Sequence, residues 1–292
     1  MRELVDAYLT YLEQELEYSP HTVAAYRNDL TQFVSWLDSR KPLGGDSWRD
    51  LSEQELTTYL LYLREREYAP STIARKIAAV KSFYKHLVEE ELLDANPTTH
   101  LNTPRVDKDT PVALSREDME RLLEEPTRMN NTSKALRDRA ILELLYGTGL
   151  RVSELVNVDV DDIDMENWTL RCGKGQTERT VPITPRAMKA LQEYLEREGG
   201  RPRLLSDDEV QTLFLNMRGQ QLTRQGLWLI IKHYVEQCAI ETPVTPHTLR
   251  HTYAIHHYRN SSGRPEERIA ELQALLGHAN SSTTQVYAQD SN

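Results

Sequence analysis

The sequence predicts a mainly α protein with a small antiparallel β-sheet, arranged as two domains. Apolar residues recur at helical spacing through most of the chain, beginning with Leu4, Tyr8 and Leu12. The segment WTLRCGKGQTERTVPIT, at 168–184, has two β-rich arms around a Gly-Lys-Gly turn, as a β-hairpin does. The length of 292 residues fits two domains of about 150 residues each.

Residues 1–95 are predicted to form a four-helix domain made of two helical hairpins. Two stretches align at an offset of fifty residues: YSPHTVAAYRNDLTQFVSWL from Tyr18 and YAPSTIARKIAAVKSFYKHL from Tyr68. Each provides a proline for the first turn of a helix, then Thr and a β-branched residue. The helical pattern is carried by Leu4, Tyr8, Tyr11, Leu12, Leu16, Val23, Tyr26, Leu30, Phe33 and Leu37.

A proline-rich segment without periodicity, at 96–113, is predicted to link this domain to a second one at 114–292. Leu136, Ala140, Ile141, Leu144 and Leu145 would lie on one face of a helix in the second domain. Its predicted elements are helices at Ser115–Leu123 and Leu136–Tyr146, the hairpin at Trp168–Thr184, a helix Arg268–Leu276 ended by Gly277, and a short last helix with Tyr287, for which Asn280 to Ser282 offer caps.

Composition excludes several classes of protein. The chain has no run of eighteen apolar residues, and its N-terminus is amphipathic and acidic, so neither a membrane span nor a signal peptide fits. We therefore expect a cytoplasmic protein. The two cysteines, Cys172 and Cys238, lack the spacing of a disulfide framework or zinc site and are expected to be packing residues.

The net charge of −10 argues mildly against a nucleic-acid partner, because such domains tend to be basic. However, the windows 69–88, 212–235 and 242–265 contain no Asp or Glu. Acidic residues are crowded elsewhere, so local positive surfaces can exist on an acidic molecule.

The motif GTGLRVSEL, at 147–155, places Arg151 at the start of a helix, where the helix dipole disfavours a cation. Such local conflicts concentrate at functional sites. Arg151 beside free helical N–H groups would form an anion site. The alternative at this point is an ion pair between Arg151 and Glu154 on the same short helix.

In TPHTLRHTYAIHHY, at 245–258, Thr245 and Pro246 are a natural N-cap and first helical residue. His247 and Arg250 then share one face, a pairing that suits an anion. His251 lies four residues after His247. A zinc site would use His247, His251, His256 and His257, but the HExxH pattern is absent and no Cys or carboxylate lies nearby in the sequence.

The remaining polar candidates are Lys174, His278 and Tyr287. Lys174 lies between two glycines of the hairpin turn, which allows a close approach to a ligand, although an exposed turn lysine is the ordinary alternative. Together the candidates supply cations, proton donors and a tyrosine nucleophile, the groups that phosphoryl transfer needs. No paired carboxylates that would hold Mg²⁺ accompany them, which disfavours a two-metal nuclease.

These motifs resemble those of the tyrosine recombinases, or phage-type integrases, and within them the Xer-like members. The matching segments are GTGLRVSEL, GKGQTERTVPIT, HTLRHTYA, LLGHANSSTTQVYA and SPHTVAAYRNDLTQF, in the family's order from about Met1 to Ala288. The resemblance implies an N-terminal core-binding (SAM-like) domain and an α-rich catalytic domain. It further implies a C-shaped clamp around DNA, with the segment from Asn96 to Pro111 as strap.

The resemblance also implies a role for each matched residue. Arg151 and Arg250 correspond to the arginines that grip the scissile phosphate, and His278 to a donor to a phosphate oxygen. Lys174 is similar to the lysine that protonates the departing 5′ oxygen, and His247 to the histidine that assists proton transfer. Tyr287 resembles the nucleophile that forms a 3′-phosphotyrosyl intermediate, without metal, ATP or other cofactor, and Glu154 is expected to be structural, orienting Arg151.

The expected partner is double-stranded DNA carrying specific recombination sites, bound by a homotetramer or by a tetramer with a second recombinase in the nucleoid. The acid-free windows suggest DNA contacts for Arg75, Lys76, Lys81, Lys85, Arg218 and Arg224. The acidic net charge predicts weak nonspecific DNA binding that falls further with salt.

Two departures from the Xer-like pattern are expected to have structural consequences. The segment YRNSSGRPEERIA, at 258–270, lengthens the spacing between Arg250 and His278 and suggests a longer surface loop. The chain also stops soon after Tyr287, where many relatives continue with a helix that docks on the next subunit, so the tail is cropped or the subunits couple differently.

The size and the lack of a preceding arm-site domain favour resolution of replicon dimers over integration or excision of a mobile element. A catalytically silent DNA-binding relative would be expected to have a substitution at one of the six matched residues, and all six are present. A type IB topoisomerase-like enzyme would share the tyrosine chemistry, but the compact helical N-terminal domain points away from it.

Overall fold

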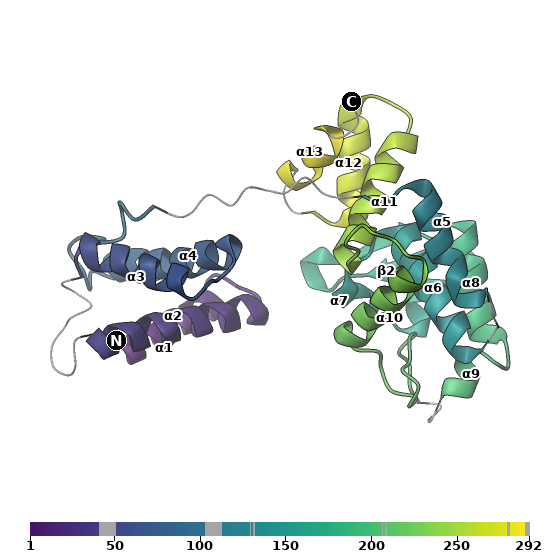
Figure 1. Ribbon diagram of the computed structural model, residues 1–292, viewed down its shortest axis with the longest axis horizontal. Coiled ribbons are helices and arrows are strands. Elements are labelled where there is room, and N and C mark those ends of the chain that lie inside the picture. Colours follow the sequence, from purple (N-terminus) through teal and green to yellow (C-terminus); the bar gives the residue numbers. More distant parts are fainter. Residues whose placement is uncertain are drawn as a thin grey trace. The chain divides into compact units, whose positions relative to one another are not determined.

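The computed structural model describes residues 1–40, 51–102, 113–128, 130, 132–205, 207, 209–278 and 281–289, without the side chains of Gln176, Ser282 and Gln289. The chain divides into two compact units, Met1–Asp109 and Thr110–Asn292, each with its own apolar core (Figure 1). The predicted class, mainly α with a small antiparallel sheet, is confirmed. In the described ranges no helix is long and apolar enough to cross a membrane.

The N-terminal unit contains the four predicted helices: α1 (Arg2–Gln14), α2 (Pro20–Arg40), α3 (Glu53–Glu65) and α4 (Pro70–Glu89). Pro20 and Pro70 each begin a helix, where the missing N–H costs no hydrogen bond. Leu16 was expected to belong to the apolar stripe of the first helix, but it lies beyond α1 and is 45% exposed. The backbone at Glu17 turns into the left-handed region at φ 51°, which ends the helical pattern there.

A buried ion pair joins α2 to α4. Asp29 is fully buried; Nζ of Lys76 lies 2.9 Å from its Oδ1, and Arg75 pairs with the other carboxylate oxygen. Lys76 itself is buried. Its ammonium group needs the Asp29 carboxylate as a partner, because an unpaired charge at this place would cost several kcal/mol. The expectation that Lys76 contacts DNA is therefore corrected: its charge is compensated inside the unit.

The other two lysines of α4 also have partners within the unit. Lys81 donates to the carbonyl of Leu101 at 2.8 Å, and Lys85 lies 3.3 Å from Glu89 on the exposed side of the helix. Leu101 and Thr98 are buried against the helices, so part of the segment expected to be a linker packs on this unit. The rest of that predicted linker, at 103–112, lies outside the described residues.

The second unit is built around one central helix, α6 (Ser133–Thr148), which packs against α5, α8 and α11. We expected a single apolar face, but α6 is buried on most sides, since neighbouring helices surround it. Two of its buried polar residues, Arg137 and Asp138, pair with each other. Around α6 lie α5 (Arg116–Glu124), η1 (Glu125–Thr127), α8 (Pro185–Glu196), α9 (Arg201–Leu204) and α10 (Arg224–Gln237).

The predicted hairpin is present as part of an antiparallel sheet with the order β1 (Ile163–Asp164), β2 (Thr169–Cys172), β3 (Arg179–Pro182). Leu170 faces Val181 across the hairpin, and the tip forms η3 (Gly175–Thr177). The strand β1 was not predicted, because two residues are too short to show an alternating pattern. The hairpin carries Lys174 in its turn and Arg179 at the start of β3, where it pairs with Cys172 next to the turn.

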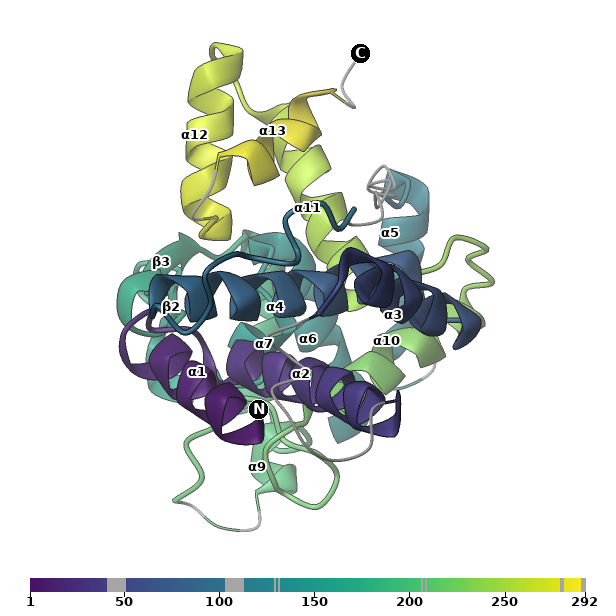
Figure 2. The same cartoon turned by 90° about the vertical axis from the view of Figure 1, so that its left-hand side faces the viewer.

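The C-terminal part consists of α11 (Pro246–Asn260), α12 (Pro265–Leu276) and α13 (Ser282–Gln289), which lie together in Figure 2. The longer surface loop expected at 258–270 is absent from the described structure: only 261–264 separates α11 from α12. Most residues of this segment belong to the two helices, and α12 begins at Pro265, not at the predicted Arg268. Asn280, the first residue of the predicted cap of the last helix, lies outside the described residues.

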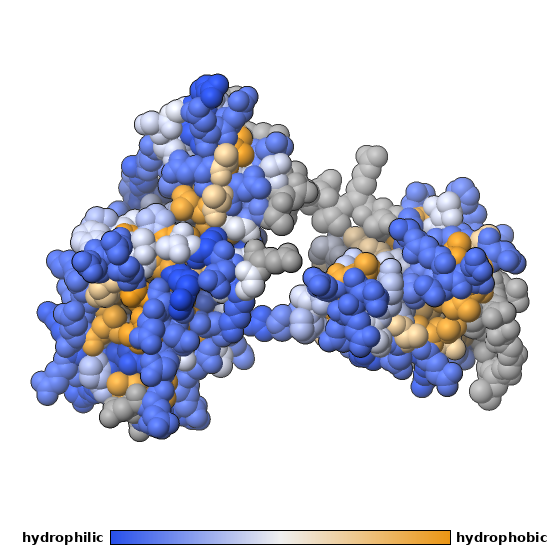
Figure 3. Space-filling view, turned by 180° about the vertical axis from the view of Figure 1, so that it is seen from behind, coloured by the Kyte–Doolittle hydropathy of each residue, from blue (hydrophilic) through white to orange (hydrophobic). Residues whose placement is uncertain are grey.

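The face of the molecule seen in Figure 3 is largely hydrophilic, with apolar areas between hydrophilic ones. Both cysteines are free and buried, as the sequence predicted, and burial raises the pKa of the Cys172 thiol to about 11. Burial also raises the pKa of the Cys238 thiol, so both thiols keep their protons at neutral pH.

Candidate active site

A pocket of about 600 Å³ in the second unit collects four of the six sequence-predicted site residues: Arg151, His247, Arg250 and His278. They come from different parts of the chain. Arg151 precedes the one-turn helix α7 (Val152–Leu155), His247 and Arg250 belong to α11, and His278 follows α12. Arg224, at the start of α10, also lines the pocket.

Local sequence explains why α11 presents two of these residues. The Thr245 side chain accepts from the N–H of Thr248 at 3.1 Å, and Pro246 occupies the first helical position, so the helix begins where the sequence predicts. His247 and Arg250, three residues apart, then share one side of the first turn.

Arg151 and Arg250 are both held by backbone carbonyls at helix ends. Arg250 donates to the carbonyls of Gly149 and Leu276, each at 2.6 Å, and Arg151 donates to the carbonyl of Gly277 at 2.8 Å. Gly149 and Gly277 end α6 and α12 in the left-handed region, with φ of 63° and 64°. The orphan carbonyls of a helix end attract cations, so these two ends fix the guanidinium groups in place.

Neither glycine can be replaced without moving a neighbour. A Cβ atom on Gly149 would lie 2.2 Å from the ring of Tyr253, and one on Gly277 would lie 2.9 Å from Nη1 of Arg179. The motifs GTG and LLGH therefore require glycine for the left-handed turn and for close packing beside the site.

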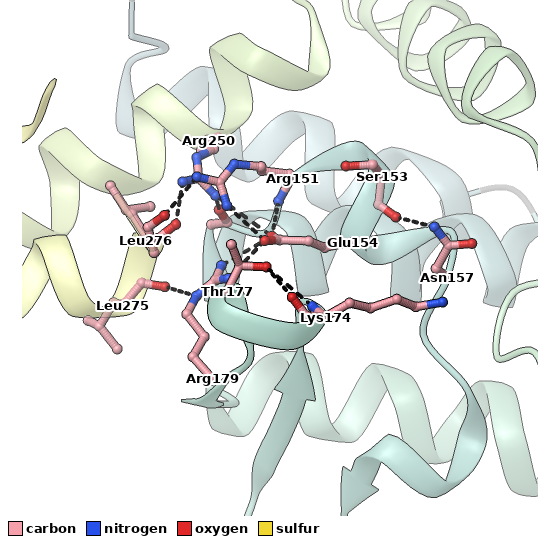
Figure 4. A network of polar contacts seen from close by, with 12 residues as sticks. Arg151, Ser153, Glu154, Asn157, Lys174, Thr177, Arg179, Arg250, Leu275 and Leu276 are labelled. Atoms are coloured by element: carbon pink, nitrogen blue, oxygen red, sulfur yellow. Dashed lines mark hydrogen bonds and ion pairs between the residues drawn. The ribbon is translucent and has the colours of Figure 1, made fainter. Parts of the chain in front are cut away.

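Glu154 lies at the centre of the arginine cluster, as Figure 4 shows. It accepts from the backbone N–H of Arg151 at 2.7 Å and from the guanidinium of Arg151 at 2.9 Å. Arg179, from β3, donates to both carboxylate oxygens at 2.8 and 3.1 Å, and its Nε donates to the carbonyl of Leu275 at 2.7 Å. Glu154 thus joins α7 to the hairpin, and Arg179 joins the hairpin to the end of α12.

Sequence reasoning left open whether Arg151 forms an anion site or an ion pair with Glu154; in the structure it both pairs with Glu154 and lines the pocket. The contribution of Arg179 was missed. Arg179 belongs to the quoted hairpin motif, but its partner Glu154 lies 25 residues earlier in the chain. A contact between two separate elements leaves no pattern in the local sequence.

The charges of the cluster leave the pocket positive. Burial alone would raise the pKa of Glu154, but hydrogen bonds from Arg179 and the Arg151 backbone, with the attraction of both guanidinium groups, lower it to about 2. Burial, and then the charge of Arg151, lower the pKa of Arg250 to about 10, so Arg250 stays charged at neutral pH. Three arginines around one carboxylate leave an excess of positive charge for an anion.

The two pocket histidines are neutral at pH 7. Burial, followed by the charges of Arg250 and Arg151, lowers the pKa of His247, and the same causes lower that of His278 to about 4. The Nδ1 atom of His278 lies 2.9 Å from the hydroxyl of Thr284. A neutral imidazole keeps one N–H, so each ring can donate one hydrogen bond to a bound anion.

Tyr287 lies beside the pocket, not in its lining. It is 2% exposed and packs in a small core with residues of α11 and α12. Its hydroxyl lies 2.6 Å from Nδ1 of His251. Sequence analysis considered His251 only as a zinc ligand, although its spacing of four residues from His247 already indicated a place near the same helix face.

Lys174 is not brought to the pocket. It is exposed, and its side chain extends away from Arg151 and Arg250 in Figure 4, while its backbone N–H donates to Thr177 at 3.3 Å. Two of the four histidines weighed as zinc ligands have partners away from the pocket. His256 shares a hydrogen bond with Tyr146 at 2.9 Å, and His257 lies 3.4 Å from Glu271.

Fold and site together define an enzyme of phosphoryl transfer on a two-unit α scaffold, and the chain belongs to the phage integrase family. The model of that family matches residues 113–292, and the model of its N-terminal SAM-like domain matches residues 5–91. The predicted resemblance to tyrosine recombinases is thereby confirmed, and the chain is a site-specific recombinase of the tyrosine type.

Individual relatives agree with this assignment. The chain is 43% identical to the tyrosine recombinase XerC of Roseiflexus sp. (strain RS-1), over 98% of this chain and 89% of that one. It is 37% identical to XerD of Halalkalibacterium halodurans, over 96% and 90%. Among solved structures, XerH bound to palindromic difH substrate shares the fold, with a TM-score of 0.73 at 21% identity over 92% of this chain and 76% of that one.

Proposed function

We propose that this recombinase cleaves and rejoins duplex DNA through a 3′-phosphotyrosyl intermediate on Tyr287. The observation that carries the proposal is one positive pocket that gathers two fixed guanidinium groups and two neutral imidazoles beside a buried tyrosine. In the transition state of phosphoryl transfer, negative charge is spread over the phosphate oxygens, and preorganised cationic donors stabilise that charge.

Each pocket residue has a role that its geometry supports. Arg151 and Arg250 bind the scissile phosphate. Backbone carbonyls hold both guanidinium groups in place before DNA binds, and Glu154 also holds Arg151. His278 donates a hydrogen bond to a phosphate oxygen, and His247 assists proton transfer. Fixing donors in advance lowers the reorganisation that the transition state would otherwise require.

Lys174 would protonate the departing 5′ oxygen. Its place at the tip of the hairpin, between Gly173 and Gly175 in left-handed conformations of φ 88° and 56°, allows the turn to bring the lysine to bound DNA. Tyr287 lies beside the pocket and must also approach the phosphate, so the step requires a small movement of α13 that keeps its hydroxyl within reach of His251. The free 5′ hydroxyl of a partner duplex then attacks the phosphotyrosyl bond and restores the tyrosine.

The proposed substrate is a pair of specific recombination sites bound by a tetramer. The N-terminal helical unit would act as the core-binding domain and the second unit as the catalytic one. Relatives named XerC and XerD favour resolution of replicon dimers in the nucleoid of the cytoplasm over integration or excision of a mobile element. The presence of all six matched residues also argues against a catalytically silent relative.

Covalent capture tests the proposal. On a nicked duplex in which cleavage releases a short fragment, the protein should form a covalent DNA adduct, seen on a denaturing gel, in EDTA and without ATP. A duplex from a related Xer site and a pool of random duplexes selected for binding would serve as substrates. Binding without any adduct on the selected duplexes would contradict the proposal.

Arg224 should contribute to DNA affinity and not to base recognition. It is exposed at the start of α10 and lines the pocket, in a window free of acidic residues. Arg224→Ala should weaken binding to specific and random duplexes alike and reduce the salt slope of log K by about 1. Lys189→Ala, which removes an exposed cation of α8 outside the pocket lining, is the control. Equal salt slopes for wild type and Arg224→Ala, measured by fluorescence anisotropy, would contradict this role.

A further inference from the structure

His251 connects the pocket to the proposed nucleophile. Its ring packs edge-on against that of His247, with centroids 4.4 Å apart, and its Nδ1 lies 2.6 Å from the hydroxyl of Tyr287. His247 lines the anion pocket, and the residue before His251 is the pocket residue Arg250. The hydroxyl of Tyr287 therefore has an imidazole nitrogen in contact with it, adjacent to the phosphate site.

The protonation states suit a proton acceptor. Burial, followed by the charges of His247 and Arg250, lowers the pKa of His251 to about 4, so the ring is neutral at pH 7. Burial raises the pKa of Tyr287, so its phenol keeps its proton at rest. A neutral imidazole carries one N–H, and the tautomer with hydrogen on Nε2 leaves Nδ1 to accept from the phenol.

We propose that His251 is an additional catalytic residue, whose Nδ1 takes the hydroxyl proton of Tyr287 as that oxygen attacks phosphorus. The inference rests on the proposed function. In this step the bond between the tyrosine oxygen and phosphorus forms and the bond from phosphorus to the 5′ oxygen breaks. The phenol proton passes to Nδ1 of His251, while Lys174 supplies a proton to the leaving oxygen. In the rejoining step His251 returns its proton to the tyrosine oxygen.

The surrounding charges make this transfer depend on DNA. The titratable and charged groups that face His251 are His247 and Arg250 from α11, Tyr287 from α13, and His278 after α12. Arg250 disfavours a second positive charge on the ring while the pocket is empty. A bound phosphate compensates Arg250 and adds negative charge nearby, which raises the pKa of His251. The base thus gains strength when the substrate is in place.

The test uses the full chain and the nicked-duplex assay with His251→Gln. Glutamine keeps a polar side chain but cannot act as a base, so the single-turnover cleavage rate should fall about 10²-fold with DNA binding unchanged. His256→Gln is the matched control, because it removes another histidine-tyrosine hydrogen bond on the same helix, that with Tyr146. Thermal unfolding of both variants would measure the structural cost separately.

A more acidic phenol should relieve the loss, because it needs less help from a base. The chain with 3,5-difluorotyrosine at position 287 should therefore regain most of the rate that His251→Gln loses. A 5′-bridging phosphorothiolate, which leaves without a proton, should rescue Lys174→Ala but not His251→Gln. Wild-type cleavage by His251→Gln, or a loss that difluorotyrosine does not relieve, would overturn the inference. Failure of the wild type itself to form an adduct would overturn the proposed function as well.

Discussion

Replacing Tyr287 by phenylalanine should abolish the covalent protein–DNA adduct and leave the fold and DNA binding intact. The change removes one oxygen from a ring that is 2% exposed and packed against Tyr253, Leu272 and Leu276. The apolar contacts remain. The loss of the hydrogen bond to His251 should cost only about 1 kcal/mol of unfolding free energy. Without the hydroxyl there is no nucleophile, so no phosphotyrosyl bond can form.

Tyr253→Phe is the matched control for this prediction. Tyr253 belongs to the same small core and is also buried, but its ring packs over Gly149 and no catalytic role is proposed for it. Cleavage of the nicked duplex and urea unfolding would be followed for both variants. An adduct that persists in Tyr287→Phe would assign the nucleophile to another residue, whereas its loss in both variants would point to damage of the shared core.

Local sequence predicted the parts of the site that local structure determines. Thr245 and Pro246 start α11 and thereby place His247 and Arg250, and Gly277 ends α12 just before His278. Each of these features depends on a cap or turn that spans only a few residues. For the same reason Pro20 and Pro70 identified two helix starts correctly.

Features that arise from packing between distant segments could not be predicted in this way. Lys76 looked like a DNA contact because its window lacks acidic residues, but its partner Asp29 comes from another helix. Arg179 likewise meets Glu154 across elements, and the contact between His251 and Tyr287 depends on how α13 packs on α11. An acid-free window describes only the neighbours of a residue along the chain, whereas a charged side chain in the folded protein is compensated by its neighbours in space.

Glu154→Ala should be the most destabilising change at the site. Glu154 is nearly buried, with 8% of its side chain exposed, and it compensates Arg179, of which 10% is exposed. Removal of one partner from a buried ion pair costs about 3–5 kcal/mol, because the other charge stays in an apolar environment. Arg151 would also lose two of its fixed contacts, so we expect the cleavage rate to fall at least about 10²-fold.

Glu154→Gln separates charge from shape, since it keeps the size and acceptor oxygen of the side chain but not its charge. The pKa of Glu154 lies at about 2 in the folded protein, below its ordinary value of 4.5. Its ionisation therefore stabilises the fold fully above about pH 4.5, and this stabilisation is lost as the pH falls toward 2. Over that range the wild type should lose up to about 3 kcal/mol more unfolding free energy than Glu154→Gln. Because the other carboxylates titrate in both proteins, the difference between their urea unfolding curves isolates Glu154. Identical acid dependence would mean that its charge does not hold the arginine cluster together.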